Sequence, residues 1–259
     1  MDEPEVLVET QAGQARLTIN REAARNALSP GVVQGLLSAI DRCEADPAVR
    51  ALVLTGAGSK VFCAGGDLGG MSGDGFLAGH DGRRLYGQLL LRLQGCKKPV
   101  VARVNGHALA GGLGLVLACD LAVAVDGAGF GTPEIDRGLF PMMLMALLQR
   151  HVGRKRALEL ITLGQRLTAA EAMSWGLVNR VVAAAALDET VGQLAGALAG
   201  KSQAILALGR RAFFMAEDLP LPQAVEALAA QLSLNVLAED AAEGVTAFLE
   251  KRSPAWKDR

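Results

Sequence analysis

The chain has 259 residues, a formal net charge of −1 and a composition that is 51% hydrophobic. A near-neutral charge argues against the basic surface of a nucleic-acid-binding protein, and no uninterrupted apolar run is long enough to span a membrane. The acidic residues 1–5 lack the basic and apolar regions of a secretory signal. We therefore expect a cytoplasmic protein with neither nucleic acid nor a membrane as partner.

The first 45 residues or so predict a strand pair followed by a helix. Residues 6–8 and 14–20 are expected to form strands that pair around a turn at Gly13. Pro30 suits the first turn of a helix and Ser29 can cap it. An amphipathic helix should therefore occupy the rest of this segment.

Three short apolar runs in the middle of the chain, residues 51–55, 100–105 and 121–125, predict strands. Strands that are apolar throughout are typical of sheets covered on both faces. Strands that alternate with helical segments in this way predict an α/β fold.

A glycine-rich stretch lies between residues 69 and 82, with six glycines at positions 69, 70, 73, 75, 79 and 82. Glycine-rich polar segments lose much conformational entropy on ordering, so this stretch is expected to be a loop. It is either a plain surface connection or a lid that helps to define a ligand pocket.

From residue 201 onward the pattern is helical, with segments at 204–216, 221–237 and 240–250. We expect a core at residues 1–200 that contains the functional site, and a helical association region at residues 201–259. Periodicity alone leaves the oligomeric state open.

Metal chemistry finds no support in the spacing of the thiols and imidazoles. The chain has four cysteines and three histidines, at Cys43, Cys63, Cys96, Cys119, His80, His107 and His151. The cysteines lie in apolar surroundings without CxxC spacing, and the histidines form no metal-ligand pattern. We expect reduced, mostly buried thiols and no metal site.

Two glycine-rich segments, residues 62–68 and 105–112, each follow a short apolar strand and remove side-chain bulk where the strand ends. A tight strand-to-helix turn explains either segment alone. Together they could direct two backbone N–H groups at one oxygen, because glycine allows a ligand to approach the backbone closely. Such an oxyanion hole would serve enolate or acyl-anion chemistry.

These two segments, read with Thr132-Pro133-Glu134 and with residues 247–252, resemble the crotonase (enoyl-CoA hydratase/isomerase) superfamily. The resemblance covers nearly the whole chain and includes residues 17–28, 97–102 and 118–121. It implies an α/β fold, a crotonase-like spiral of ββα turns with a helical C-terminal trimerisation region. It also implies a homotrimer or a dimer of trimers.

The resemblance implies an acyl-CoA substrate and three catalytic groups. The oxyanion donors are the N–H groups of Gly66 and Gly111, and the general acid/base is Glu134. Apolar surroundings would raise the pKa of that carboxyl toward neutrality. Ala110 replaces the first glycine of the family's triplet, a change that keeps the donor amide.

One departure from the family's hydratases bears on the reaction. They carry a second glutamate three residues after the donor glycine, where this chain has Gly114. Two glutamates hold and split a water molecule, whereas one carboxylate suits the movement of a proton between two carbons. We therefore favour a double-bond isomerase, in which a glutamate restored at position 114 would raise hydration.

A second departure lies in residues 142–148, which are apolar where hydratases typically have a glycine-rich turn. Bulky side chains there would exclude water from the site. The alternative is a simple repacking of a helix start, since methionine fills irregular gaps.

CoA binding is implied for five residues: Arg25, Lys60, Ala64, Phe248 and Lys251. A neighbouring subunit would contribute the last two. Lys60 could equally be an ordinary solvated lysine. No cofactor beyond the CoA moiety of the substrate is expected.

Other polar residues are weaker candidates. Asp67 either assists catalysis or tethers the donor turn, and Asp136 lies close enough to Glu134 in sequence to assist it. Asp120 is expected to make structural hydrogen bonds, and His107 could shape the pocket.

Two alternatives to the isomerase stay open at this point. The chain could be an enoyl-CoA hydratase that uses a single glutamate, or a non-catalytic CoA-binding or RNA-binding member of the superfamily. The intact donor glycines and Glu134 argue against a loss of catalysis, and the near-neutral charge argues against RNA.

Overall fold

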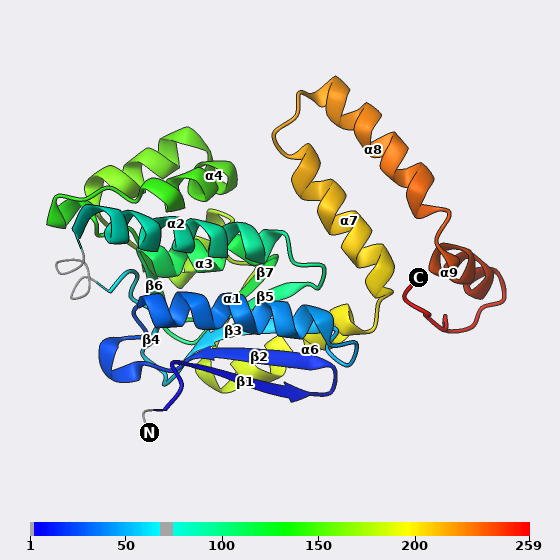
Figure 1. Ribbon diagram of the computed structural model, residues 1–259, viewed down its shortest axis with the longest axis horizontal. Coiled ribbons are helices and arrows are strands. Elements are labelled where there is room, and N and C mark those ends of the chain that lie inside the picture. Colours follow the sequence, from blue (N-terminus) through cyan, green and yellow to red (C-terminus); the bar gives the residue numbers. More distant parts are fainter. Residues whose placement is uncertain (1–2, 68–74) are drawn as a thin grey trace.

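A computed structural model describes residues 3–67 and 75–259 (Figure 1). Its larger sheet has six strands in the order β1-β2-β3-β5-β7-β10. β1 and β2 pair in antiparallel fashion, as the sequence predicts, and every other neighbouring pair is parallel. The strands are β1 (Val6–Gln11), β2 (Gln14–Ile19), β3 (Ala51–Gly56), β5 (Val100–Val104), β7 (Leu121–Val125) and β10 (Arg180–Val182).

A second sheet has four strands in the order β4-β6-β8-β9. β4, β6 and β8 run parallel, and β9 is antiparallel to β8. The strands are β4 (Val61–Cys63), β6 (His107–Leu109), β8 (Gly129–Gly131) and β9 (Arg166–Thr168). Sequence analysis does not identify this sheet, because three residues are too few for a periodic pattern.

Helices connect the strands. They are α1 (Pro30–Ala45), α2 (Gly75–Gln94), α3 (Gly111–Ala118), α4 (Met142–Leu163), α5 (Ala169–Ser174) and α6 (Leu187–Ala199), with short 3₁₀ turns η1 (Glu22–Ala24), η3 (Ile135–Arg137) and η4 (Ala184–Ala186). The Ser29 hydroxyl accepts a hydrogen bond from the Val32 N–H (3.0 Å), which confirms the predicted cap of α1.

The prediction of a loop at residues 69–82 is wrong for residues 75–82. Residues 75–82 form the first turns of α2, although three of them are glycines. Helix α2 packs against α1 and α3 further along, so tertiary contacts outweigh the low helix propensity of glycine. Residues 69–74, and with them the first half of the prediction, lie outside the described residues.

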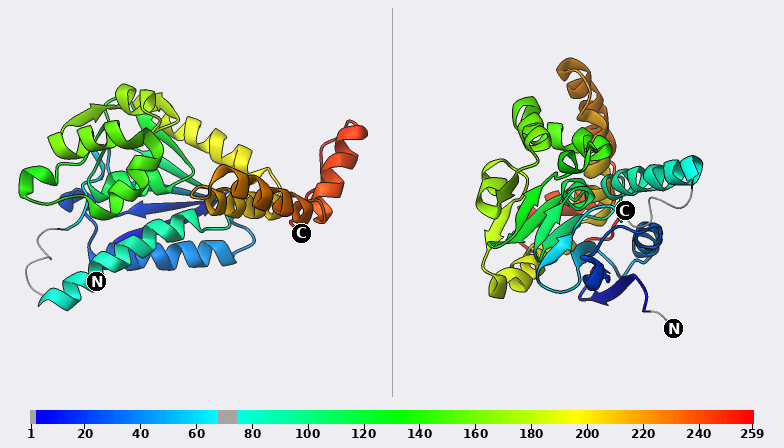
Figure 2. Two further views of the ribbon diagram at one scale, coloured as in Figure 1. Left: turned by 90° about the horizontal axis from the view of Figure 1, so that it is seen from above. Right: turned by 90° about the vertical axis from the view of Figure 1, so that its left-hand side faces the viewer.

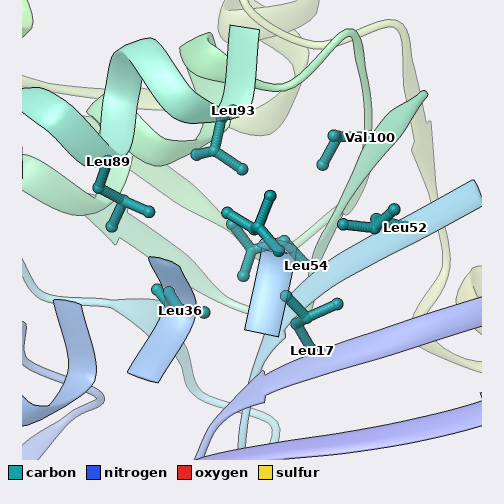
Figure 3. A pocket seen from close by; sticks show the side chains of 8 residues that line it. Leu17, Leu36, Leu52, Leu54, Leu89, Leu93 and Val100 are labelled. Atoms are coloured by element: carbon teal, nitrogen blue, oxygen red, sulfur yellow. The ribbon is translucent and has the colours of Figure 1, made fainter. Parts of the chain in front are cut away.

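The main core lies between the larger sheet and the helices α1 and α2. Figure 3 shows Leu36 of α1 and Leu89 and Leu93 of α2 facing Leu17 and Leu54 of the sheet. All six residues of β3 are buried, which agrees with a strand covered on both faces, and α6 contacts the opposite face of the sheet. Burial of each large apolar side chain contributes roughly 1.5–3 kcal/mol to stability.

Three helices follow residue 200, in agreement with the predicted helical region. They are α7 (Gln203–Ala216), α8 (Leu221–Asn235) and α9 (Glu239–Leu249). Figure 1 and the left view of Figure 2 show α8 and α9 extending away from the sheets. Many large apolar side chains on these helices are exposed, among them Phe213, Leu221, Leu232 and Phe248.

A partly buried ion pair joins α7 to the core. The guanidinium of Arg210 donates to both carboxylate oxygens of Asp120 at 2.7–3.0 Å, and the Val100 N–H donates to the same carboxylate (2.7 Å). The side chains of Arg210 and Asp120 are 10% and 18% exposed. The structural role expected for Asp120 is confirmed.

The four cysteines are buried free thiols, as predicted. Burial raises the pKa of Cys63 to about 12, so this thiol stays protonated at neutral pH. None of the helices within the described residues combines the length and the apolar character needed to cross a membrane.

Candidate active site

The segments that carry the predicted catalytic groups leave the second sheet at one edge. β4 pairs in parallel with β6, and β6 pairs in parallel with β8. From these strand ends the chain continues into residues 64–67, 110–111 and 132–134. The carboxyl ends of parallel strands are where α/β sheets bind ligands. The second sheet thus brings the predicted donors and acid together.

The two donor turns are in direct contact. Gly65 has a φ of +97°, and a Cβ on this residue would lie only 2.5 Å from the Cβ of Ala110. A side chain at position 65 would force the turns apart, so glycine is required there. Leu28 holds the first turn, since its N–H donates to Gly65 O (2.8 Å) and its carbonyl accepts from the Asp67 N–H (3.2 Å).

Both proposed donor amides are available for a ligand. Leu28 bonds to the residues on either side of Gly66, so the Gly66 N–H points away from that bridge. Gly111 begins α3, where the first N–H groups have no acceptor within the helix. Within residues 3–67 and 75–259, neither amide has a hydrogen-bond acceptor. These two N–H groups can donate to an oxyanion.

Ala110 holds the second turn in a strained conformation. Its φ and ψ are 52° and −130°, which a residue with a Cβ rarely adopts. The Ala110 N–H donates to Gly131 O (2.8 Å), so the pairing of β6 with β8 imposes this conformation. The loss of the family's glycine at this position therefore keeps the donor amide and adds strain.

Ala110→Gly is expected to raise the free energy of unfolding by about 1 kcal/mol, because relief of a strain of about 1–3 kcal/mol exceeds the entropy cost of glycine. Chemical denaturation would measure the change. Ala108→Gly, in the buried strand β6 with ordinary backbone angles, is the matched control and should lower stability. Destabilisation by Ala110→Gly as well would contradict the prediction.

Glu134 follows β8 and is held by its backbone. The Thr132 hydroxyl donates to Leu160 O on α4 (3.0 Å), and Glu134 O accepts from the N–H groups of Arg137 (2.9 Å) and Leu139 (3.0 Å). The side chain is half-buried, and its Oε2 is buried without a hydrogen-bond partner among the described residues. A buried oxygen of this kind is costly unless a ligand uses it.

Burial raises the pKa of the Glu134 carboxyl above its ordinary value of 4.5, although its own backbone N–H and the charge of Arg137 oppose the shift. A raised pKa makes a carboxylate a stronger base and makes its acid form available closer to neutrality. The environment expected for this residue is therefore present.

Tyr86 of α2 is a site residue that sequence analysis misses. Its hydroxyl donates to Gly111 O (2.8 Å), and Glu134 and Cys63 lie close enough to influence its ionisation. A Cβ on Gly111 would stand 3.3 Å from a methyl group of Leu28 and 3.4 Å from the Tyr86 ring. Nothing in the local sequence marks Tyr86, because it lies on a segment remote from every motif.

Tyr86 is the only tyrosine of the chain, so its ionisation can be followed directly by the ultraviolet absorbance of tyrosinate. Burial, reinforced by Cys63 and Glu134, raises its pKa well above the ordinary value of 10.0. We expect no tyrosinate signal at pH 10 in the folded protein, and ionisation together with unfolding at higher pH. A reversible titration of the folded protein near pH 10 would contradict this burial.

Two of the three weaker candidates, Asp67 and His107, have structural partners, and Asp136 is exposed. Asp67 forms an ion pair with Arg21 (Nη1 to Oδ2, 3.0 Å) at the end of the first donor turn. Asp136 is exposed, and its carboxylate lies beside Gly164 at the end of α4. His107 Nδ1 accepts from the Gly129 N–H (2.9 Å) between β6 and β8. The contacts of Asp67 and His107 favour structural roles.

The sequence model of the enoyl-CoA hydratase/isomerase family matches residues 9–259. The chain belongs to this family.

Family relatives align over almost their full length. The 2,3-dehydroadipyl-CoA hydratase of Escherichia coli is 35% identical, over 98% of this chain and 99% of the relative. The crotonyl-CoA hydratase of Syntrophomonas wolfei is 36% identical, over 95% of both chains. The crystal structure of an enoyl-CoA hydratase from Mycobacterium smegmatis is 38% identical, covers 98% of this chain and 99% of its own, and has a TM-score of 0.93. The crotonase fold is thereby confirmed.

Three of the residues that the family resemblance assigns to CoA, Arg25, Lys60 and Ala64, lie on segments at the two ends of β4. Arg25 is exposed, and its carbonyl accepts from the Ala64 N–H (3.1 Å). Lys60 is exposed one residue before β4, and its carbonyl accepts from the His107 N–H (3.0 Å). Arg25 and Ala64 thus meet at the first donor turn, whereas Lys60 lies at the other end of β4.

Asn26, which sequence analysis does not single out, links these segments. It is fully buried, and its side-chain amide donates to Ala57 O (3.0 Å) and Val61 O (2.7 Å). Both Arg25 and Asn26 have positive φ values, 54° and 53°, which asparagine tolerates best. The arrangement places the backbone of Arg25 beside the end of β4.

Phe248 and Lys251 do not approach this group within one chain. Phe248 is 81% exposed near the end of α9, and Lys251 follows the helix with a φ of +55°. Figures 1 and 2 place α9 at the opposite end of the molecule from β4. A contact between these two residues and CoA at the same chain's site is therefore excluded.

Proposed function

We propose that this protein is an enoyl-CoA isomerase in which Glu134 is the only carboxylate that acts on the substrate. The observation that carries the proposal is the surroundings of Gly114. A side chain at this position would collide with the Tyr86 hydroxyl, so the chain has neither a second acid there nor room for one. Family membership supplies the class of substrate, a CoA thioester.

The chemistry follows from one base and two amides. Glu134 removes a proton from C2 of a 3-enoyl thioester, and the electron pair moves through the carbonyl to give a dienolate. The N–H groups of Gly66 and Gly111 would donate to the dienolate oxygen, and each such donor is typically worth about 10²–10³ in rate. The protonated Glu134 then returns the proton to C4, which leaves the double bond between C2 and C3 with no atom gained or lost.

Hydration by a single glutamate is the second candidate. The names of the relatives favour it, since those of Escherichia coli and Syntrophomonas wolfei are called hydratases. In that reaction Glu134 would handle both the water and the proton at C2. Glu134 Oε2, which has no hydrogen-bond partner in the described part of the chain, could serve either reaction. The choice therefore depends on whether water reaches the site.

A panel of 2-enoyl- and 3-enoyl-CoA thioesters, followed by chromatography and mass spectrometry, separates the two. Movement of the double bond without a change in mass supports the isomerase. A product that gains the mass of water, and that disappears in Glu134→Gln, supports a one-glutamate hydratase and overturns our proposal. Turnover of neither would indicate another CoA reaction or a binding role.

We also propose that Arg25, Lys60 and the backbone at Ala64 bind the CoA moiety, with Phe248 and Lys251 supplied by a neighbouring subunit. Two exposed cations support the first part, Arg25 at the first donor turn and Lys60 at the other end of β4. The exposed apolar side chains of α7–α9 support association of α9 with a second copy, as a trimer or a dimer of trimers. A cytoplasmic location stays a prediction from the sequence.

A further inference from the structure

Tyr86 and Gly114 compete for one space next to the donor turn. A Cβ on Gly114 would overlap the Tyr86 hydroxyl oxygen, whereas its next neighbours, Tyr86 Cζ and Leu144 Cδ1, would stand at 3.4 and 3.6 Å. The last two distances are ordinary van der Waals contacts. Among the described residues, the hydroxyl oxygen is therefore the one atom that leaves no room for a Cβ at position 114.

The hydrogen bond of Tyr86 determines what its hydroxyl can do there. A tyrosine hydroxyl has one proton to donate, and this one goes to Gly111 O at 2.8 Å. The group is thus held in place and presents only lone pairs to a ligand. Its pKa is raised by burial, so it stays neutral and does not act as a base at working pH.

Two apolar side chains of α4 lie near Gly114 and near Gly87, the residue after Tyr86. Leu144 of α4 is 2% exposed and lies over Gly114, and Met143 packs against the core with its sulfur 3.9 Å from a Cβ placed on Gly87. Of the three atoms among the described residues that lie nearest to a Cβ on Gly114, only the Tyr86 hydroxyl oxygen is polar, and it occupies the position at which hydratases of the family carry an acid.

We propose that Tyr86 is a specificity-determining residue, whose hydroxyl fills the room of a second acid at Gly114 and keeps both a carboxylate and a water molecule out of it. The inference rests on the proposed isomerase function and extends it. It also corrects an expectation from the sequence. A glutamate at position 114 does not fit while Tyr86 is present, so Gly114→Glu alone should not raise hydration.

The test compares Gly114→Glu, Tyr86→Phe and the double variant with wild type. Hydration of a 2-enoyl-CoA and isomerisation of a 3-enoyl-CoA are measured separately in each protein. Phenylalanine removes the overlapping oxygen and keeps the ring, so the double variant should raise the ratio of hydration to isomerisation about tenfold or more. An equal rise in Gly114→Glu alone, or no rise in a folded double variant, would overturn the proposal.

A smaller side chain keeps the proposal testable if the glutamate variants do not fold. Gly114→Ala should lower Tm by about 5 °C or more when Tyr86 is present, because overpacking outweighs the better helix propensity of alanine. In the Tyr86→Phe background the same change should leave Tm equal or higher. Equal effects in both backgrounds would show that the hydroxyl is not the obstacle.

The outcomes also separate this proposal from the proposed function. Isomerisation by wild type without a gain of hydration in the folded double variant would reject the role of Tyr86 and keep the isomerase. A gain of hydration in the double variant, when wild type does not isomerise, would keep the role of Tyr86 and reject the isomerase.

Discussion

Replacement of Glu134 by glutamine is expected to lower turnover of the enoyl-CoA substrate about 10³-fold, the usual range for loss of a general acid/base. Glutamine has nearly the same shape but can neither accept the proton from C2 nor return it. Steady-state kinetics on the substrate identified by the thioester panel would measure the loss. Retention of activity within a few-fold of wild type would contradict the mechanism.

Two measurements test whether the lost activity of Glu134→Gln reflects a general change in charge on this turn or a loss of stability. Asp136→Asn is the matched control, since Asp136 is an exposed carboxylate on the same turn and should change turnover only slightly. The stability of Glu134→Gln should equal or exceed that of wild type at neutral pH. The folded state raises the pKa of this carboxyl, so the free energy of unfolding of wild type falls as pH rises from the ordinary pKa through the raised one. Glutamine does not ionise, so the variant has no such loss.

The pH dependence of wild type follows from the same shift. Isomerisation requires the carboxylate form of Glu134, and burial raises the pKa of this carboxyl above 4.5. Activity should therefore fall as pH drops through the raised pKa, at a higher pH than an exposed glutamate would give.

Asp120→Ala is expected to lower the free energy of unfolding by about 3–5 kcal/mol, because it leaves the Arg210 guanidinium partly buried without its partner. Arg210 Nη1 is already buried without a hydrogen bond among the described residues, and the Val100 N–H would also lose its acceptor. A loss of this size corresponds to a fall in Tm of about 10 °C, which thermal unfolding would detect.

Asp218→Ala is the matched control for this pair. Asp218 also accepts two hydrogen bonds from one arginine, Arg150, at 3.1 and 2.8 Å, but its side chain is 69% exposed. Exposed pairs of this kind are worth about 1 kcal/mol or less. Equal losses in the two variants would show that burial of the Asp120 pair does not contribute, and that α7 is held to the core by other contacts.

The predictions that succeed are those that depend on local pattern. The cap at Ser29, the hairpin at Gly13 and the three helices after residue 200 each follow from a few neighbouring residues and agree with the structure. The buried strand β3 likewise follows from an uninterrupted apolar run. Periodicity and capping act over short distances along the chain, so a single sequence contains them.

The predictions that fail or are missing involve elements whose stability comes from distant partners. Residues 75–82 are glycine-rich but helical, because they belong to a helix that packs on α1 and α3. Sequence analysis does not predict the second sheet, because its three-residue strands are stable only when β4, β6 and β8 pair together. The sequence contains these residues but carries no local signal of their pairing.

The candidate active site shows the same division. The glycines at 66 and 111, the acid at 134 and the missing acid at 114 are visible in the sequence, because each belongs to a motif that continues along the chain. That a tyrosine hydroxyl occupies the space beside Gly114 is visible only in three dimensions. The motifs identify the chemical groups of the site. The packing of α2 against α3 determines how much space is left beside them for a substrate, an acid or a water molecule.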